Sequence, residues 1–510
     1  MRRLAAVVFV AAACLACRTP SQADRGPASV REPAVAGRFY PASAAALRGA
    51  VEAFLGDAVP RKPGRPVALI APHAGYVFSG QIAADAWRQA QGEAVDLVVI
   101  LGTNHTAPGF RGAALVPAGG FRTPLGVAET DRGASEALIA ADPDCIFDAG
   151  VHAREHSVEV QVPFVQVLFP KAKILPVVVG SPDPALCERL GQAIGRVAAD
   201  RRALVVASSD LSHYPSAADA AAVDREVLEA AARLDPDRLR SVIRRAMARG
   251  VPGLSTCACG EAPILVAMSA ARALGATRGA VASYATSGDV AVGDARRVVG
   301  YGAVVFTDGP AGADTAVLEP RPDAGAPGRL EAGDRRALLA LARETIRRYL
   351  ETGTIPLSRG LSARVRAPRG AFVTLTKDGA LRGCIGRMAP DAPLDRVVGA
   401  MALQAAANDP RFPPVGPEEV AALRIEISVL SPMRPVAGAA EIVVGRDGVL
   451  LSKDGRSAVF LPQVATEQGW GRDEMLDHLC LKAGLSRGCW KTGAEFSVFQ
   501  AEVFREGEGM

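Results

Sequence analysis

Short apolar runs rich in valine, isoleucine and leucine alternate with longer amphipathic segments through the first part of the chain. Such runs are typical of strands that are buried on both faces of a parallel sheet. The segments between them have the spacing of amphipathic helices. The pattern therefore predicts an α/β domain with a largely parallel sheet. The predicted strands are Val67–Ile70, Leu97–Leu101, Ile174–Val179 and Leu204–Ala207, and the predicted helices are Ala44–Leu55, Ser135–Ala141 and Ala217–Leu234.

The last third of the chain has a different pattern, in which one helical segment is followed by short alternating runs. Two pairs of these runs are joined by Asp-Gly, which supplies the turn conformation of a tight hairpin. We therefore expect a smaller α+β domain. Its predicted elements are the helix Asp334–Glu351, the hairpin of Ala371–Thr376 with Ala380–Ile385, the strand Arg424–Leu430, the hairpin of Gly448–Leu451 with Ala458–Leu461, and the helix Arg472–Ala483.

A segment rich in proline, glycine, alanine and aspartate, Asp308–Gly328, separates these two patterns and has no apolar periodicity. It reads as an interdomain linker. A chain of 510 residues also exceeds the size of a single ordinary core, which stops growing at about 250 to 300 residues. We expect a first domain over residues 30–307, a linker over 308–330 and a second domain over 331–507.

The first residues have the form of an export signal. Two arginines precede the apolar stretch Leu4–Ala13, and small residues lead to Cys14 and Cys17. A cysteine after small residues is typical of a lipoprotein signal, so we expect residues 1–17 to be a signal and Cys17 or Cys14 to be lipidated. The alternative is a plain cleaved signal with incidental cysteines. The expected location is periplasmic or outer-membrane-anchored.

Composition narrows the class of protein. Hydrophobic residues make up 49% of the chain, charged residues 22%, and the net charge is +4 without a long basic block. These values describe a soluble globular protein and do not indicate a nucleic-acid partner. Seven of the nine cysteines follow the signal, an odd number in a long chain, so a disulfide framework is not expected.

Histidines concentrate in the first predicted domain, which holds five of the six. His73 and His105 each follow a predicted strand, and Asp210 with His213 follows another. Loops at the carboxyl ends of neighbouring parallel strands converge on a shared crevice. Three imidazoles and a carboxylate in equivalent loops therefore predict a metal site, although any one of them alone would be an ordinary imidazole.

Two other features are more ambiguous. His156 is flanked by Glu155 and Glu159, which either orient a neighbouring imidazole or, in the case of Glu159, form only a helix-surface charge. Cys257 and Cys259 form a C-x-C pair, which is weak evidence for a metal or redox site unless it reaches the histidines.

Several motifs of the first domain occur in the order found in the MEMO family, which this part of the chain resembles. They are REPAVAGRFYP, PHAGYVFSG, LGTNH, EHSVEVQVPF, SSDLSHY, CGEAP and VVGYGAVVF. The resemblance implies a fold similar to the class III extradiol dioxygenases, with His73, His105 and Cys259 as metal ligands and with Asp210 and His213 lining the pocket. Two imidazoles and one anionic ligand suit non-haem iron, whereas the softer thiolate would equally favour copper or zinc. The metal therefore stays open, with iron the first expectation and copper the second.

The second domain resembles the AMMECR family through LRGCIG, NDPRFPP, EISVLSP, LPQVATEQGW and CLKAGL. That family has no established activity. Cys384 is a candidate nucleophile whose pKa Arg382 would lower, but a small residue on a packed strand or in a binding groove is the favoured interpretation.

The two resemblances together imply a fusion of proteins B and A of the AmmeMemoRadiSam system, which also contains a radical-SAM protein. Export would separate this chain from such a cytosolic partner. The first functional hypothesis is dioxygenase-like redox chemistry on an unknown substrate, with protons moved by His213 that Asp210 orients. The alternative is a non-catalytic metal- or peptide-binding module whose second domain recruits a partner. A hydrolase using Ser208 or Ser209 ranks last, because no G-x-S-x-G elbow surrounds them.

Overall fold

The computed structural model describes residues 29–116, 119–309 and 328–507. The expected signal with Cys14 and Cys17 lies outside the described residues, as does almost all of the expected linker. No helix in the described part of the chain is both long and apolar enough to cross a membrane.

The first half of the chain is built around an eight-stranded sheet with the order β10-β11-β2-β9-β3-β8-β4-β7. The four predicted strands are its centre, and each runs parallel to its neighbour. The sheet as a whole is mixed, because β11 pairs antiparallel with both β10 and β2, and β4 pairs antiparallel with β8. The strands are β2 (Pro66–Ala71), β3 (Leu97–Thr103), β4 (Ala113–Leu115), β7 (Cys145–Phe147), β8 (Lys173–Val179), β9 (Ala203–Ser208), β10 (Arg278–Thr286) and β11 (Gly300–Thr307).

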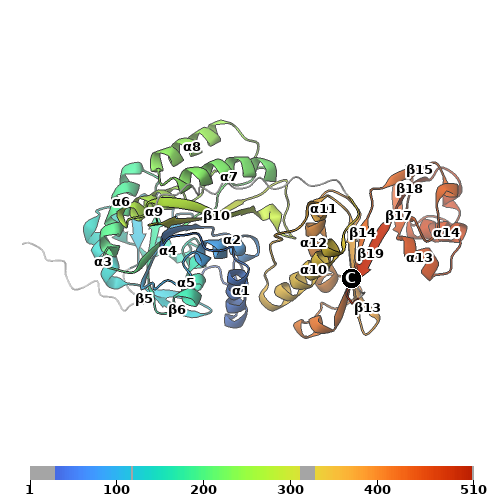
Figure 1. Ribbon diagram of the computed structural model, residues 1–510, viewed down its shortest axis with the longest axis horizontal. Helices are drawn as coiled ribbons and strands as arrows, with labels where there is room; N and C mark the ends of the chain where they lie inside the picture. The colour runs from blue at the N-terminus through green and yellow to red at the C-terminus, as the bar shows by residue number, and fades with distance from the viewer. Residues whose placement is uncertain (1–28, 117–118, 310–327, 508–510) are drawn as a thin grey trace, which may run out of the picture.

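Helices cover both faces of this sheet, as Figure 1 shows. Alternate residues of each central strand enter two separate cores: Leu69 packs on one face and Ile70 on the other. This explains the unbroken apolar runs in the sequence. One face carries α1 (Ala44–Gly56), α2 (Tyr76–Arg88) and α5 (Val162–Leu168), and the other carries α3 (Arg132–Ala141), α6 (Pro184–Ala198), α7 (Ala217–Ala232), α8 (Pro236–Ala248) and α9 (Glu261–Ala273).

A small three-stranded sheet, β1-β5-β6, lies beside this layer structure. Its strand β1 joins the first described residues to a distant part of the chain by pairing parallel with β5. Its members are β1 (Ser29–Arg31), β5 (Gly119–Thr123) and β6 (Gly126–Glu129), and the short helix α4 (Ala149–Ala153) follows β7.

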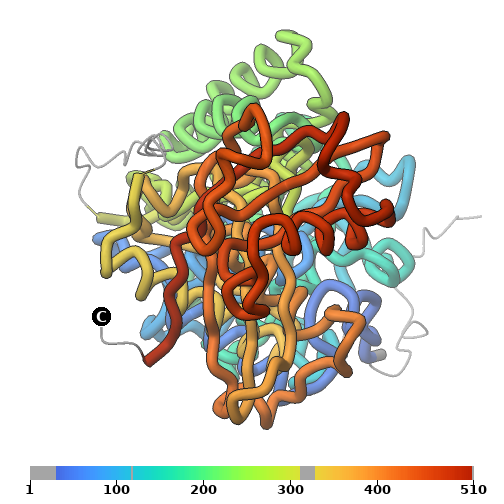
Figure 2. Tube along the Cα trace, turned by 90° about the vertical axis from the view of Figure 1, so that its right-hand side faces the viewer, coloured from blue at the N-terminus to red at the C-terminus, as the bar shows by residue number. Residues whose placement is uncertain are grey.

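The second half contains two four-stranded antiparallel sheets, each with its own apolar core. The first sheet has the order β13-β12-β14-β19 and packs against two helices; the second, β15-β18-β16-β17, lies at the far end of the molecule, in front in Figure 2. Both predicted Asp-Gly turns have a positive φ at the aspartate and at the glycine. The elements are α10 (Ala332–Thr352), α11 (Ala363–Arg366), β12 (Ala371–Lys377), β13 (Ala380–Arg387), α12 (Leu394–Ala407), β14 (Leu423–Leu430), β15 (Arg434–Val436), β16 (Gly448–Lys453), β17 (Arg456–Phe460), α13 (Pro462–Glu467), α14 (Arg472–Lys482), β18 (Glu495–Phe499) and β19 (Ala501–Arg505).

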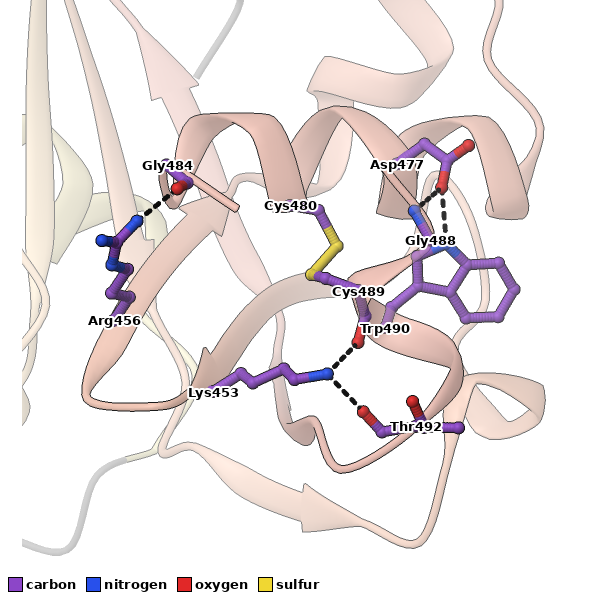
Figure 3. Close-up of a disulfide and its surroundings, with 9 residues drawn as sticks. All are labelled: Lys453, Arg456, Asp477, Cys480, Gly484, Gly488, Cys489, Trp490 and Thr492. Atoms are coloured by element: carbon purple, nitrogen blue, oxygen red, sulfur yellow. Dashed lines mark hydrogen bonds between the residues drawn. A yellow bond between two sulfur atoms is a disulfide. The ribbon is translucent and has the colours of Figure 1, made fainter. Parts of the chain in front are cut away.

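A disulfide, Cys480–Cys489, ties α14 to the segment before β18, and sequence reasoning missed it. Figure 3 shows it beside Trp490, whose indole N–H donates to Asp477 at 2.8 Å, and Lys453, whose ammonium donates to the Cys489 carbonyl at 3.0 Å. Five other described cysteines are free. The described residues therefore contain one disulfide, which the odd number of cysteines did not predict.

Replacing both Cys480 and Cys489 by alanine is expected to lower the free energy of unfolding of this end of the chain by ~2–3 kcal/mol. The crosslink spans nine positions, and closing a loop of that length removes conformational entropy from the unfolded chain. Urea unfolding followed by the fluorescence of Trp470 and Trp490 would measure the change. Reduced wild-type protein is the control and should show a similar loss; equal stability of variant and oxidised wild type would contradict the prediction.

Candidate metal centre

The carboxyl ends of the three neighbouring strands β2, β9 and β3 place the candidate residues at one edge of the sheet. His73 follows β2, His105 follows β3, and Asp210 follows β9. Cys259 comes from the loop just before α9. Gly102, near the end of β3, is in close contact with the loop after α4, since a Cβ there would lie 2.5 Å from Val158 and 2.6 Å from the Ser157 hydroxyl. A side chain at this position would displace the loop that carries His156.

The three expected ligands come together. One ligand atom each of His73, His105 and Cys259 lies within 4.8 Å of the others, and Cys259 Sγ is 3.1 Å from His73 Nε2. Nitrogen and sulfur ligands about 2.0–2.3 Å from an ion lie roughly 3–4 Å from one another. The separation of Cys259 and His73 falls in this range, and the ligand atom of His105 lies within 4.8 Å of both. Of the C-x-C pair, Cys259 reaches the histidines, whereas Cys257 is buried with its sulfur toward the Ile243 carbonyl.

Hydrogen bonds fix the tautomer of His73. The single hydroxyl proton of Ser208 is donated to the Ser157 carbonyl at 2.6 Å, and Ser208 also accepts from the Gln161 amide. His73 Nδ1, 3.1 Å from the same oxygen, must therefore donate its proton to it. The other nitrogen, Nε2, then carries a lone pair that faces Cys259.

His105 is held by Glu155, which confirms for this residue the interpretation that it orients a neighbouring imidazole. One carboxylate oxygen of Glu155 is 2.9 Å from His105 Nδ1, and the other accepts the His105 backbone N–H at 2.7 Å. Hydrogen bonding lowers the pKa of this carboxyl to about 2 against the opposing effect of burial. A carboxylate on Nδ1 leaves Nε2 as the ligand atom, which is the usual arrangement behind a metal-bound histidine. The only sequence signal was an acidic residue near a histidine.

His156 belongs to the same cluster. Its ring lies 4.7 Å from that of His105, nearly parallel, and 5.4 Å from that of His73. Its Nδ1 is 3.5 Å from Glu155, and His105, Glu155 and His156 form a second group of possible ligands. Burial lowers the pKa of His156 to about 4, so the ring is neutral at physiological pH and has a lone pair to offer.

Glu159 does not orient an imidazole, and it is not a surface charge either. It is fully buried, and its carboxylate accepts hydrogen bonds from Arg31 at 2.7 Å and from the Tyr40 hydroxyl at 2.6 Å. The backbone N–H groups of Ala34 and Val35 donate to it as well. Both sequence interpretations were wrong, because the partners of Glu159 come from a segment more than a hundred residues earlier.

Asp210 and His213 lie at the site, but not in the relation that the sequence suggested. His213 Nδ1 is 3.0 Å from the Leu211 carbonyl, and the carboxylate of Asp210 accepts the backbone N–H of His73 at 2.8 Å. Asp210 therefore positions the His73 loop and does not orient His213. Ligand atoms of Asp210, His213 and Cys259 nevertheless lie within 4.8 Å of one another.

Burial favours the neutral forms of three groups at the site, His73, Cys259 and Asp210. It lowers the pKa of His73, an effect to which the neighbouring His105 adds, and it raises the pKa of the Cys259 thiol, to which the nearby Asp210 adds. It also raises the pKa of Asp210. Without an ion, the thiol is therefore protonated and His73 is neutral, as expected for groups removed from water.

The serine candidates lack the geometry of a nucleophile. Ser208 uses its proton on the Ser157 carbonyl, and Ser209 donates to the Asp210 carbonyl while accepting the Gly260 N–H. Both are fully buried. The structure therefore does not favour the hydrolase hypothesis.

Cys384 lies on β13, half-buried, with its sulfur 3.2 Å from the Thr374 hydroxyl. Arg382, the arginine that the sequence suggested as the partner of this thiol, pairs with Glu419 instead. Arg411 is the arginine that contacts this residue, donating to the Cys384 carbonyl at 3.0 Å. His478 stacks on Trp470 in the other sheet unit. Among the described residues, no histidine hydrogen-bonds to Cys384, so a Cys-His pair is not formed there.

Comparison with known proteins agrees with both resemblances. The family model described as Memo-like protein matches residues 31–305, and the AMMECR1 model matches residues 339–504. A MEMO1 family protein of Methanopyrus kandleri is 38% identical over 292 residues, which cover 55% of this chain and 99% of the relative. Another, from Nitrosopumilus maritimus, is 34% identical over 287 residues and covers 54% and 99%.

Among solved structures, an uncharacterized protein of Pyrococcus horikoshii is 40% identical and covers 33% of this chain and 90% of its own. Its TM-score is 0.32, which is too low to carry an argument about the fold.

Proposed function

We propose, since this chain belongs to the Memo-like family and carries an AMMECR1 domain behind it, that its first half is a metal-dependent redox protein with dioxygenase-like chemistry. The observation that carries the proposal is the convergence of His73, His105 and Cys259 within 4.8 Å. Each histidine has its Nδ1 engaged by a fixed partner, so both Nε2 lone pairs are available to one ion.

The donor set fits a redox-active ion. Two imidazoles and one thiolate would hold it, and a non-haem site of this kind leaves positions open for substrate and O₂. Iron is the proposed metal, because two imidazoles and one anionic ligand suit non-haem iron, and copper is the second, because the thiolate is a soft ligand. We also propose, as part of this function, that the first half has a fold similar to that of the class III extradiol dioxygenases.

The surrounding residues have separate tasks in this proposal. Glu155 holds His105 and Asp210 holds the His73 loop, so both fix ligand geometry. His213 and His156 have ring nitrogens at the site and would accept or return a proton of the substrate.

A test is O₂ consumption by iron-loaded protein with a panel of catechols. Turnover retained in His73→Ala protein would refute the proposal.

Metal affinity is expected to rise about tenfold per pH unit between about pH 6 and about pH 8. The raised pKa keeps the Cys259 thiol protonated in the ion-free site, so each ion must displace one proton. His73, whose pKa is lowered, is already neutral in this range, so it releases no proton on metal binding and does not add to the change of affinity with pH. Titration with Co²⁺ followed by absorbance measures the affinity at each pH. Cys259→Ser protein is the control, with a flatter profile expected; pH-independent binding by the wild type would contradict the prediction.

A second candidate is a non-catalytic metal- or peptide-binding module whose AMMECR1 domain recruits a partner. It is favoured by one observation: in the described part of the chain, every group of candidate metal ligands belongs to the first half. It predicts binding without turnover, so catalytic consumption of any substrate by the purified protein would exclude it.

We also propose that the chain is exported as a lipoprotein. The support is the signal-like start of the sequence and the Cys480–Cys489 disulfide, a bond typical of oxidising compartments. Export would separate it from a cytosolic radical-SAM protein. Fractionation of cells expressing wild-type, Cys14→Ala and Cys17→Ala proteins is the test: loss of the membrane-bound form in one variant is expected, and a cytosolic wild type would refute export.

A further inference from the structure

The two halves of the chain meet through ion pairs of one polarity. Each pair joins an arginine of the second half to an aspartate of the first. In Figure 1, α10, α11 and α12 lie on the side of the second half that faces the first. The pairs are Arg348 with Asp57, Arg359 with Asp85, and Arg396 with Asp289.

Two of these arginines are held rigidly. The Asp85 side chain is fully buried, and Arg359 Nη1 donates to it at 3.0 Å. Arg396 Nη2 donates to Asp289 at 3.0 Å, and both of these side chains are largely buried. Buried partners of this kind fix the orientation of a guanidinium before any ligand arrives.

A cavity of about 380 Å³ lies at this junction. Its walls come from the end of β10, from the loop around Arg359, from α11 and from the first turn of α12. Three guanidinium groups line it, those of Arg359, Arg366 and Arg396, against the single carboxylate of Asp395. The volume suits a small molecule.

Arg366 differs from the other two arginines of the lining. Its Nη1 atom is buried and has no hydrogen-bond partner among the described residues. A buried charged donor without an acceptor is costly, and native structures rarely leave one unpaired. The ion pairs to Asp85 and Asp289 already balance Arg359 and Arg396. Arg366 is therefore the guanidinium of the lining that has a donor to spare, with Asp395 as the one carboxylate in the same lining.

The first turn of α12 places the amino end of a helix, together with the Asp395 carboxylate that this turn carries, at the same cavity. The helix begins at Leu394, and its N-cap residue, Pro393, makes no side-chain capping bond. The amino end of a helix carries partial positive charge and favours an anion. The turn and the three guanidiniums face the same cavity.

We propose that this cavity binds a small molecule with a phosphate or carboxylate group, held by Arg366 between the Memo-like and AMMECR1 parts of the chain. This is a second site, on other residues than the candidate metal centre. The oxyanion would accept from the Arg366 guanidinium and would be flanked by the two fixed guanidiniums. A ligand here contacts both halves, which gives a physical reason for joining them in one chain.

Calorimetric titration of the chain from residue 18 onward, with both halves present, tests the site. Inorganic phosphate and succinate are titrated separately in chloride buffer of matched ionic strength. We expect saturable binding of at least one of them, about tenfold or more weaker in Arg366→Gln protein. The matched control, Arg336→Gln, removes an exposed arginine of α10 and should bind as the wild type does. Preference for one anion identifies the class of ligand.

Absence of saturable binding by the wild type up to ~10 mM of either anion would overturn the proposal, as would equal binding by Arg366→Gln protein. Arg366→Lys serves as a second variant if the glutamine variant does not fold. It keeps the charge but lacks the planar fork of donors, so its binding must also be weaker than that of the wild type. Unchanged affinity in this variant would also overturn the assignment.

Discussion

Simultaneous replacement of His73, His105 and Cys259 by alanine is expected to abolish metal binding by a protein that otherwise carries near-stoichiometric iron or copper. The three residues bring two imidazoles and a thiol together at the strand ends, with one ligand atom of each within 4.8 Å of the others. The triple variant lacks all three proposed metal ligands. The neighbouring His156 and His213 cannot replace a thiolate and two fixed imidazoles. Elemental analysis of anaerobically purified protein from residue 18 onward measures the effect.

The control for this experiment is His478→Ala. That histidine lies in the second half, stacked on Trp470, and its loss should leave the metal content unchanged. Circular dichroism of the triple variant checks that the fold is intact. Iron or copper lost in the triple variant alone would support the proposed centre and justify a search for O₂-dependent substrates. Metal retained in the triple variant would refute the assignment, and no metal in either protein would leave the binding-module candidate.

Glu159→Gln is expected to lower the free energy of unfolding of the first half by ~3–5 kcal/mol, the usual cost of breaking a buried ion pair by removing one partner. The side chain of Glu159 is completely buried and that of Arg31 is 8% exposed. Four donors converge on the carboxylate, from Arg31, Tyr40 and two backbone N–H groups. An amide nitrogen would oppose one of them and leave the guanidinium uncompensated.

Chemical denaturation with a matched exposed variant checks this result. Glu136→Gln removes a carboxylate that is about half exposed and pairs with Arg132 on a helix, so it should change stability by no more than ~0.5 kcal/mol. Equal stability of the two variants would show that the buried pair contributes little. Arg31 also donates to the Glu155 carbonyl, so metal affinity should fall with the Glu159 change as well.

Local pattern was sufficient for the main elements. The four predicted strands are the parallel centre of the sheet, and the predicted helices α1, α3 and α7 begin and end within a few residues of their expected bounds. A strand that is buried on both faces needs apolar side chains at every position, and such a run can be recognised within the sequence of the strand itself. The short strands β4 and β7 had no such signal, because a run of three residues carries too little periodicity.

For the candidate ligands too, the sequence predicted one part of the site and the fold decided the other. Their place after strands was visible in the sequence, and parallel neighbours bring such loops together whatever their separation along the chain. Which loops become neighbours is set by strand order, and the approach of Cys259 to His73 spans 186 positions. The choice of Cys259 over Cys257 came from family resemblance, and the geometry agrees with it.

The sequence by itself determined the two-part organisation, the buried central strands and the set of histidines at their ends. Each of these depends on local composition and on the spacing of apolar residues within a single strand or helix. Tertiary structure alone decided that Glu155 holds His105, that Glu159 is a buried partner of Arg31, that Cys480 pairs with Cys489, and that three arginines meet at one cavity. Those relations join side chains from different elements. They depend on packing distances that no local pattern encodes.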